Sequence, residues 1–284
     1  MTLKQAISQA AALLARHDIE DARLEAEVLL RHQLGISRVV LYQDRERTIT
    51  EQESADFGRL IKRRLSGEPL AYITGHRESY GLDFRVDARV LIPRPETELL
   101  VEKALELARN QAITTIADIG TGSGAIAVSL ALNLPEALIY ATDISPDALE
   151  VARVNCRNHR VSERVRLLQG DLLVPLTVPV DMIIANPPYV TASEVAGKRL
   201  GNFEPELALD GGHDGLDKVR QLGRNLVGKL KPDGWLLVEI GAGQDPDAIR
   251  FFKELYPAAV VEIVPDLAGI RRVLALRFPQ PGLT

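Results

Sequence analysis

The chain has 284 residues, room for one large or two smaller domains, and its 46% hydrophobic and 26% charged residues are typical of a globular protein. With 34 Lys and Arg against 39 Asp and Glu, the net charge of −5 disfavours nucleic acid as the main partner, since duplex-binding surfaces usually need a basic excess. The single cysteine, Cys156, excludes an intramolecular disulfide and a cysteine-ligated zinc site.

The N-terminal segment is amphipathic and lacks a long apolar stretch, so we expect no signal peptide. No uninterrupted apolar run approaches the roughly 18 residues of a membrane span. The five histidines form no spaced cluster, and we expect no metal site. We therefore expect a cytoplasmic protein without a membrane partner, and we also expect a monomer.

Residues 1–71 carry apolar side chains at helical spacing. A second helix is expected to begin at Asp21, with Leu24 facing inward, and Thr50 with Glu53 forms the pattern of a capping box. Short helices are stable only when they pack on one another. The sequence therefore predicts a small, all-helical N-terminal domain.

The spacing of the apolar residues changes over residues 72–92. Aromatic and β-branched residues interrupted by Gly75 and Gly81 predict a hairpin linker. Pro95 then helps to hold the chain extended, and Thr97 is expected to cap the helix that follows.

From residue 115 onward, apolar strands alternate with amphipathic helices. The expected strands are TTIADIG, LIYATDIS, VRLLQGD, VDMIIANPPY, GWLLVEIG and two more near residues 259–265 and 272–277. This alternation predicts an α/β domain over residues 93–284, with a mostly parallel sheet covered on both faces. Ligands of such sheets bind beyond the C-terminal ends of the strands.

The segment DIGTGSG places Gly120, Gly122 and Gly124 between the first strand and a helix. Glycines there permit a tight turn and close approach of a ligand to the backbone. Gly120, Gly122 and Ala125 also fit the dinucleotide pattern G-x-G-x-x-A, so a dehydrogenase is open on this segment alone. A purely structural turn is open as well.

Acidic residues end the next two strands. Asp143 can accept hydrogen bonds from both hydroxyls of a ribose, and Asp171 can accept one from an exocyclic adenine amine. Either acid can instead cap a helix or face solvent. A glycine turn and two acids on three successive strand ends together predict a nucleoside site.

The fourth strand ends in Asn186-Pro187-Pro188-Tyr189. The Asn186 side-chain carbonyl and the Pro187 backbone carbonyl can accept both hydrogens of a planar NH2 group. The prolines fix the backbone, and Tyr189 offers a flat face for stacking. An amide nitrogen is a poor nucleophile, so this grip would aim its free face at a methyl donor and favour the developing positive charge. The alternative is a rigid turn after a strand.

These motifs resemble a known family. DIGTGSG, TDIS and GD are similar to the cofactor site of class I S-adenosylmethionine-dependent methyltransferases, and NPPY resembles the motif of enzymes that methylate planar NH2 groups in DNA, RNA or protein. The segments GEPLAYITGHRESYGLDFRV, LIPRPETELLVE and FEPELALDGG resemble, in this order, the HemK/PrmC family of release factor N5-glutamine methyltransferases. The resemblance runs from about residue 67 to the C-terminus.

The resemblance implies a Rossmann-like, mostly parallel seven-stranded sheet and a helical N-terminal domain that helps to hold the substrate. It implies S-adenosylmethionine as cofactor, S-adenosylhomocysteine as product, and the glutamine of the Gly-Gly-Gln motif of class I peptide chain release factors as substrate. The residues that it assigns to the cofactor site are Asp118, Gly120, Thr121, Gly122, Ser123, Gly124, Asp143, Asp171, Leu172 and Asn186.

It assigns catalysis and substrate binding to Asn186, Pro187, Pro188 and Tyr189. Asp118 is expected to face the cofactor's α-amino group. Leu172 stands where the family often has an aromatic residue against the adenine. We also expect the segment Arg94, Pro95, Thr97 and Glu98 near the cofactor pocket, and the polar loop 191–215 to shape the substrate channel.

Three alternatives accompany this interpretation. A related enzyme class methylates a ribosomal-protein glutamine and shares NPPY. A nucleic-acid amino methyltransferase is disfavoured by the acidic charge and by the RPETE and FEPE segments. A cofactor-binding scaffold without activity is disfavoured by the intact NPPY motif.

Overall fold

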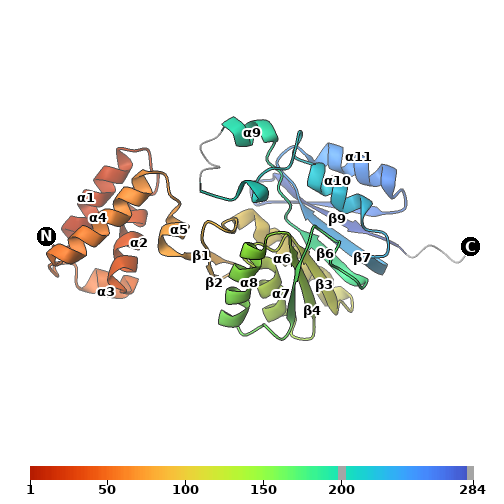
Figure 1. Cartoon of the computed structure of the whole chain (residues 1–284), viewed down its shortest axis with the longest axis horizontal. Coiled ribbons are helices and arrows are strands. Elements are labelled where there is room, and N and C mark those ends of the chain that lie inside the picture. Colours follow the sequence, from red (N-terminus) through yellow and green to blue (C-terminus); the bar gives the residue numbers. More distant parts are fainter. Residues whose placement is uncertain (198–202, 280–284) are drawn as a thin grey trace, which may run out of the picture. The chain divides into compact units, whose positions relative to one another are not determined.

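The computed structural model describes residues 1–197 and 203–279 and divides into two compact units, Met1–His76 and Arg77–Thr284. The N-terminal unit consists of packed helices around a core of their apolar side chains (Figure 1). The helices are α1 (Leu3–Ala15), α2 (Ala22–Leu34), α3 (Arg38–Gln43), α4 (Glu51–Leu65) and α5 (Leu70–Thr74).

The expected capping box at the start of α4 is confirmed. Thr50 Oγ1 accepts from the Glu53 backbone N–H, and Glu53 Oε2 accepts from the Thr50 backbone N–H. The expected start of α2 is confirmed, because Asp21 is its N-cap residue, but Asp21 makes no side-chain capping bond. The expectation that Leu24 faces inward is wrong, since Leu24 is 49% exposed. The reason is the helical period, because the buried stripe of α2 follows a different face, formed by Ala22, Ala26, Leu29 and Leu30.

The C-terminal unit begins with a hairpin and continues into a seven-stranded sheet, as the sequence predicts. The hairpin strands, β1 (His76–Ser79) and β2 (Leu82–Arg85), fall within residues 72–92. The predicted domain boundaries themselves stay a prediction. The strands of the large sheet are β3 (Thr115–Ile119), β4 (Leu138–Asp143), β5 (Val165–Gln169), β6 (Val180–Ala185), β7 (Leu230–Glu239), β8 (Val260–Pro265) and β9 (Arg271–Arg277).

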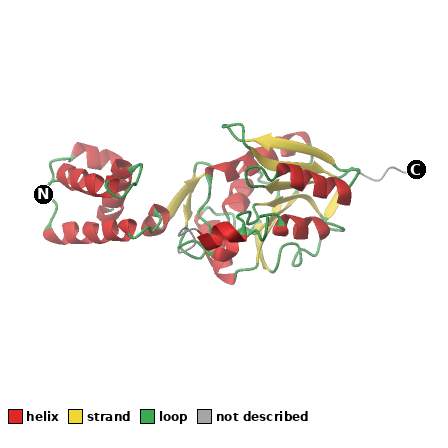
Figure 2. Cartoon of the chain, turned by 90° about the horizontal axis from the view of Figure 1, so that it is seen from above, coloured by secondary structure: helices red, strands yellow, loops and turns green. Residues whose placement is uncertain are grey.

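The order of the large sheet is β5-β4-β3-β6-β7-β9-β8, and β9 is antiparallel to both of its neighbours. The helices α10 (Asp217–Arg224) and α11 (Asp245–Leu255) pack on one face. On the other face lie α6 (Glu98–Asn110), α7 (Ala125–Asn133) and α8 (Pro146–Asn158) (Figures 1 and 2). Since both faces are covered, the central strands are almost continuously apolar.

Shorter elements lie near the ends of the strands: η1 (Pro95–Thr97), α9 (Ala192–Gly197) and η3 (Glu206–Ala208). Within the described part of the chain, no helix is long and apolar enough to cross a membrane.

The parallel register aligns the ends of the central strands. Ile119 of β3 lies beside Thr142 of β4 and beside Ala185 of β6, and Ala185 in turn lies beside Val238 of β7. The residues that follow these positions are therefore neighbours at one edge of the sheet. They are the glycine loop, Asp143, Asn186 and Glu239.

Candidate active site

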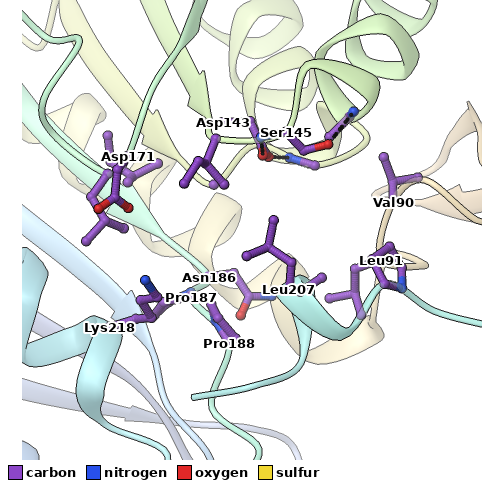
Figure 3. Close-up of a pocket in the computed structure, with 18 of the residues that line it drawn as sticks. Val90, Leu91, Asp143, Ser145, Asp171, Asn186, Pro187, Pro188, Leu207 and Lys218 are labelled. Atoms are coloured by element: carbon purple, nitrogen blue, oxygen red, sulfur yellow. Dashed lines mark hydrogen bonds between the residues drawn. The ribbon is translucent and has the colours of Figure 1, made fainter. Parts of the chain in front are cut away.

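A pocket lies at this edge, at the C-terminal ends of β3, β4, β5 and β6 (Figure 3). It holds about 880 Å³ of empty space, its open mouth included. The predicted site residues that line it are Gly120, Gly122, Asp143, Asp171, Leu172, Asn186, Pro187 and Pro188. The other predicted residues do not line it; they are Asp118, Thr121, Ser123, Gly124 and Tyr189.

The glycines of the loop differ in what surrounds them. Gly120 has a φ of +71°, and a Cβ there would meet no atom within 4 Å. Gly124 has a φ of +82°, but a Cβ there would lie 3.3 Å from the Ala152 side chain in α8. Gly120 therefore keeps space open in the pocket, whereas Gly124 permits close packing of α7 on α8.

Asp143 fixes the glycine loop and faces the pocket. Its Oδ2 accepts from the Gly122 N–H and its Oδ1 from the Ser145 N–H, both at 2.9 Å (Figure 3). Burial raises the pKa of Asp143, and these backbone hydrogen bonds oppose the rise. Each carboxylate oxygen has more than one lone pair, so both oxygens can still accept from a ribose.

The far end of the pocket is completed by α10, whose contribution the sequence did not reveal. Gln221 Nε2 donates to Asp171 Oδ2 at 2.7 Å, and Lys218 lines the pocket on the same side as Asp171 (Figure 3). Leu172 has a φ of +46°, and its carbonyl accepts from Thr142 Oγ1 at 3.0 Å. This bond fixes the unusual backbone that presents Leu172 to the pocket.

Asp118 is completely buried beneath the glycine loop. Its Oδ2 accepts from Thr121 Oγ1 at 2.6 Å and from the Ala127 N–H at 3.2 Å, while its Oδ1 has no partner among the described residues. Burial raises the pKa of Asp118 to about 7. An unpartnered buried carboxylate oxygen is costly, and a cationic group of a ligand would relieve that cost.

Asn186 is held from a distant segment. Its Nδ2 donates to Thr97 Oγ1 at 2.9 Å. Thr97 is 8% exposed and precedes α6, yet its side chain makes no capping bond. The expectation that Thr97 caps this helix is therefore wrong, because its hydroxyl serves Asn186 instead.

The RPETE and FEPE segments meet beside the pocket. Arg94 pairs with Glu204 at 2.5 Å, and the other oxygen of Glu204 accepts from the Ile92 N–H at 3.1 Å. Glu204 is 8% exposed, and Leu207, shortly after it, lines the pocket opposite Asp143 (Figure 3). Residues 198–202 of the predicted substrate loop lie outside the described residues, and the role of that loop stays a prediction.

Two glycines allow the chain to pack against the NPPY backbone. A Cβ on Gly211 would lie 2.6 Å from the Pro188 carbonyl oxygen, and one on Gly215 would lie 2.2 Å from that of Tyr189. Gln244 Nε2 also donates to the Tyr189 carbonyl at 2.9 Å. The backbone that follows Asn186 is therefore tightly held.

Glu239, at the end of β7, is a residue that the sequence analysis missed. It is 1% exposed, and its Oε2 has no hydrogen-bond partner among the described residues. Burial raises the pKa of Glu239 to about 7, although the nearby side chains of Thr97 and Tyr189 act to lower it. Burial, together with the charge of Glu239, raises the pKa of Tyr189 to about 12. An acid at the end of an apolar strand is the same signal that identified Asp143, and it would have revealed Glu239.

Known proteins share this architecture and sequence. Residues 5–75 match the family described as PrmC N-terminal domain, and residues 95–203 match the one described as Methyltransferase small domain. A solved methyltransferase from Pyrococcus furiosus has a TM-score of 0.53 at 18% identity, covering 77% of this chain and 97% of that one. At this identity the likeness shows the fold alone.

Sequence relatives are more specific. The release factor glutamine methyltransferase of Moorella thermoacetica is 45% identical over 271 residues, which are 95% of this chain and 96% of that protein. The one of Koribacter versatilis is 42% identical over 286 residues, covering 98% and 99%. Identity at this level over nearly the whole of each protein shows that the chain belongs to the family of release factor glutamine methyltransferases.

Proposed function

We propose that this protein transfers a methyl group from S-adenosylmethionine to the side-chain amide N5 of the glutamine in the Gly-Gly-Gln motif of class I peptide chain release factors. Membership of the family supports the reaction and its substrate. The observation that carries the proposal is the amide end of the pocket, where Thr97 engages the Asn186 nitrogen and leaves the Asn186 oxygen for a substrate NH2 group.

The residues at the other end of the pocket suit the cofactor. S-adenosylmethionine supplies a methyl group activated by a sulfonium. The unpartnered Oδ1 of Asp118 suits the α-amino group of its methionine part, and Asp143 suits its ribose. Asp171 and Leu172 would hold the adenine.

The chain's own residues would orient the amide and stabilise charge. Asn186 Oδ1 and the Pro187 carbonyl accept the two N–H bonds of the glutamine, while Tyr189 supports the amide plane. As the N–C bond forms and the S–C bond breaks, positive charge moves from sulfur to nitrogen, and nitrogen then loses one proton. The two carbonyl oxygens stabilise that charge most strongly when it develops.

The N-terminal helical domain, residues 1–71, would help to bind the release factor. The reaction would take place in the cytoplasm, where translation termination occurs. The support for this role of the domain is the match of residues 5–75 to PrmC N-terminal domain. The hairpin linker at residues 72–92 would then join it to the catalytic domain at residues 93–284.

Labelled methyl transfer tests this function. Purified enzyme and methyl-labelled S-adenosylmethionine are combined with a bacterial class I release factor, with its Gln→Ala variant in the Gly-Gly-Gln motif, with ribosomal proteins or with duplex DNA. We expect label on the intact release factor alone. Label on the Gln→Ala variant, on a ribosomal protein or on DNA would refute the assigned target.

A further inference from the structure

We propose that Thr97 and Glu239 are positioning residues that orient the side-chain amide of Asn186, so that its oxygen and not its nitrogen meets the substrate NH2 group. This inference rests on the proposed function, because it concerns how the glutamine amide is held. It adds two residues, from outside the NPPY motif, to the machinery of that reaction.

An asparagine side chain needs a neighbour to determine which way it points. One end of its amide accepts hydrogen bonds and the other end donates them, and the two ends have nearly the same shape. Thr97 is the neighbour of Asn186, with its Oγ1 2.9 Å from Nδ2. A threonine hydroxyl can accept or donate, so Thr97 alone does not decide the orientation.

Glu239 removes that ambiguity. The register of β6 and β7 pairs Ala185 with Val238, so Asn186 and Glu239 follow adjacent strand ends. Glu239 is buried, its Oε2 has no hydrogen-bond partner among the described residues, and the side chain of Thr97 lies close enough to lower its pKa. An ionised carboxylate only accepts, so it draws the hydroxyl hydrogen of Thr97 toward itself. Thr97 then offers Asn186 only an acceptor, which binds Nδ2 and turns Oδ1 away.

The side chain of Tyr189 also acts on this carboxylate and lowers its pKa. Glu239 therefore interacts with both ends of the NPPY motif, with Asn186 through Thr97 and with Tyr189 directly. The other charged groups that act on Glu239 are Glu96, which raises its pKa, and Arg272, which lowers it. Glu239 is a buried acid with an unpartnered oxygen beside the amide end of the site.

The reversed orientation would oppose the reaction. With Nδ2 turned to the substrate, two NH2 groups would face each other and no hydrogen bond would form between them. A protonated Glu239 would allow this reversal, since it can donate to Thr97 and free the Thr97 hydroxyl to donate to Asn186 Oδ1. The reaction should therefore need Thr97 as a hydroxyl and Glu239 as an anion.

Thr97→Val tests the hydroxyl, because valine has almost the same shape and cannot accept from Asn186. With a class I release factor as substrate, we expect kcat to fall roughly 10- to 100-fold, the scale of losing an oriented polar contact to the developing charge. The KM for S-adenosylmethionine should stay within about twofold of wild type, because Thr97 lies outside the pocket lining. Thr97→Ser retains the hydroxyl and should restore most of kcat.

Thr115→Val is the matched control. Thr115 Oγ1 donates to the Asp181 carboxylate at 2.8 Å, at the opposite edge of the sheet, so this variant loses a threonine hydroxyl that binds a polar side chain away from the pocket. It should retain the wild-type kcat. Thermal unfolding of the variants checks that they remain folded.

Glu239→Gln gives a second readout, the pH dependence of kcat. If Glu239 had only a structural role, its replacement would not alter that pH dependence. At saturating S-adenosylmethionine, the wild-type kcat should rise as pH increases through about 7, because Glu239 becomes ionised there. The kcat of Glu239→Gln should be low and nearly independent of pH over that range.

The possible failures can be told apart. A wild-type enzyme that does not label the release factor would overturn the proposed function and this inference with it. An active wild type accompanied by a Thr97→Val variant with the wild-type kcat would overturn the positioning role alone. A Thr97→Ser variant as impaired as Thr97→Val, or a Glu239→Gln variant that retains the wild-type pH profile, would do the same.

Discussion

The two ends of the pocket are built in different ways. At the cofactor end, Asp143 and Asp118 each bind a group close to them in sequence, Ser145 and Thr121, and Asp171 alone is supported from a distant helix, by Gln221. At the amide end, Thr97, Asn186 and Glu239 come from three distant segments that only the sheet brings together. A local motif therefore contains most of the cofactor end, whereas the amide motif depends on supports that lie outside it.

The largest effect should come from breaking the amide end at its centre. Asn186→Ala removes the side-chain carbonyl that accepts from the substrate, and we expect kcat to fall at least about 10²- to 10³-fold. Labelled methyl transfer to a release factor measures this loss. Circular dichroism should show that the variant remains folded, because Asn186 lies after the strand rather than within it.

Asn110→Ala is the corresponding control, since Asn110 is exposed at the end of α6 and bonds only within that helix. It should leave kcat unchanged. Near-normal turnover by Asn186→Ala would mean that other groups bind the substrate amide. The contrast between the cofactor end and the amide end of the pocket would then be wrong.

The difference between the two ends also explains how far the sequence could be interpreted. Apolar periodicity and strand-end motifs predicted the seven-stranded sheet and the residues at its edge, because those signals are local. No local pattern indicated that Thr97 binds Asn186 instead of capping its helix, or that Gln221 supports Asp171. Such contacts depend on the tertiary arrangement, which propensity and spacing do not contain.

Leu24 shows the same limit on a smaller scale. Its apolar side chain fits a helical pattern, but 49% of it is exposed, since the packed face of α2 is decided by neighbouring helices. Glu239 is a different case, because its position at a strand end was visible in the sequence. The strand-end argument that selected Asp143 would have selected it too.

An intermediate effect should come from the cofactor end, through Asp118. Asp118→Asn removes the charge of the unpartnered oxygen, and hydrogen bonds to charged groups contribute about 1.5–3 kcal/mol, so S-adenosylmethionine should bind roughly 10- to 100-fold more weakly. Isothermal titration calorimetry measures the dissociation constant without any release factor. This variant therefore tests the cofactor end independently of the amide end.

The affinity for S-adenosylmethionine should also depend on pH, in a direction set by the ionisation of Asp118. Because burial raises the pKa of Asp118 to about 7, the carboxyl is largely protonated at lower pH and must lose its proton to pair with a cationic amino group. The wild-type affinity should therefore increase from about pH 5.5 to about pH 7, and that of Asp118→Asn should change little. Equal pH profiles for the two proteins would exclude Asp118 as the partner of the amino group.

The smallest effect should separate two glycines within one loop. Both Gly120→Ala and Gly124→Ala force alanine into a left-handed backbone, which costs about 1–2 kcal/mol in the free energy of unfolding. At Gly124 the new methyl group also presses on Ala152, so the melting temperature should fall further, while the affinity for S-adenosylmethionine changes little. At Gly120 it projects into the pocket, so affinity should fall as well. Calorimetric titration and thermal unfolding of both variants distinguish the two outcomes. If the two variants showed the same losses of affinity and of melting temperature, the two glycines would not have separate roles in binding and packing.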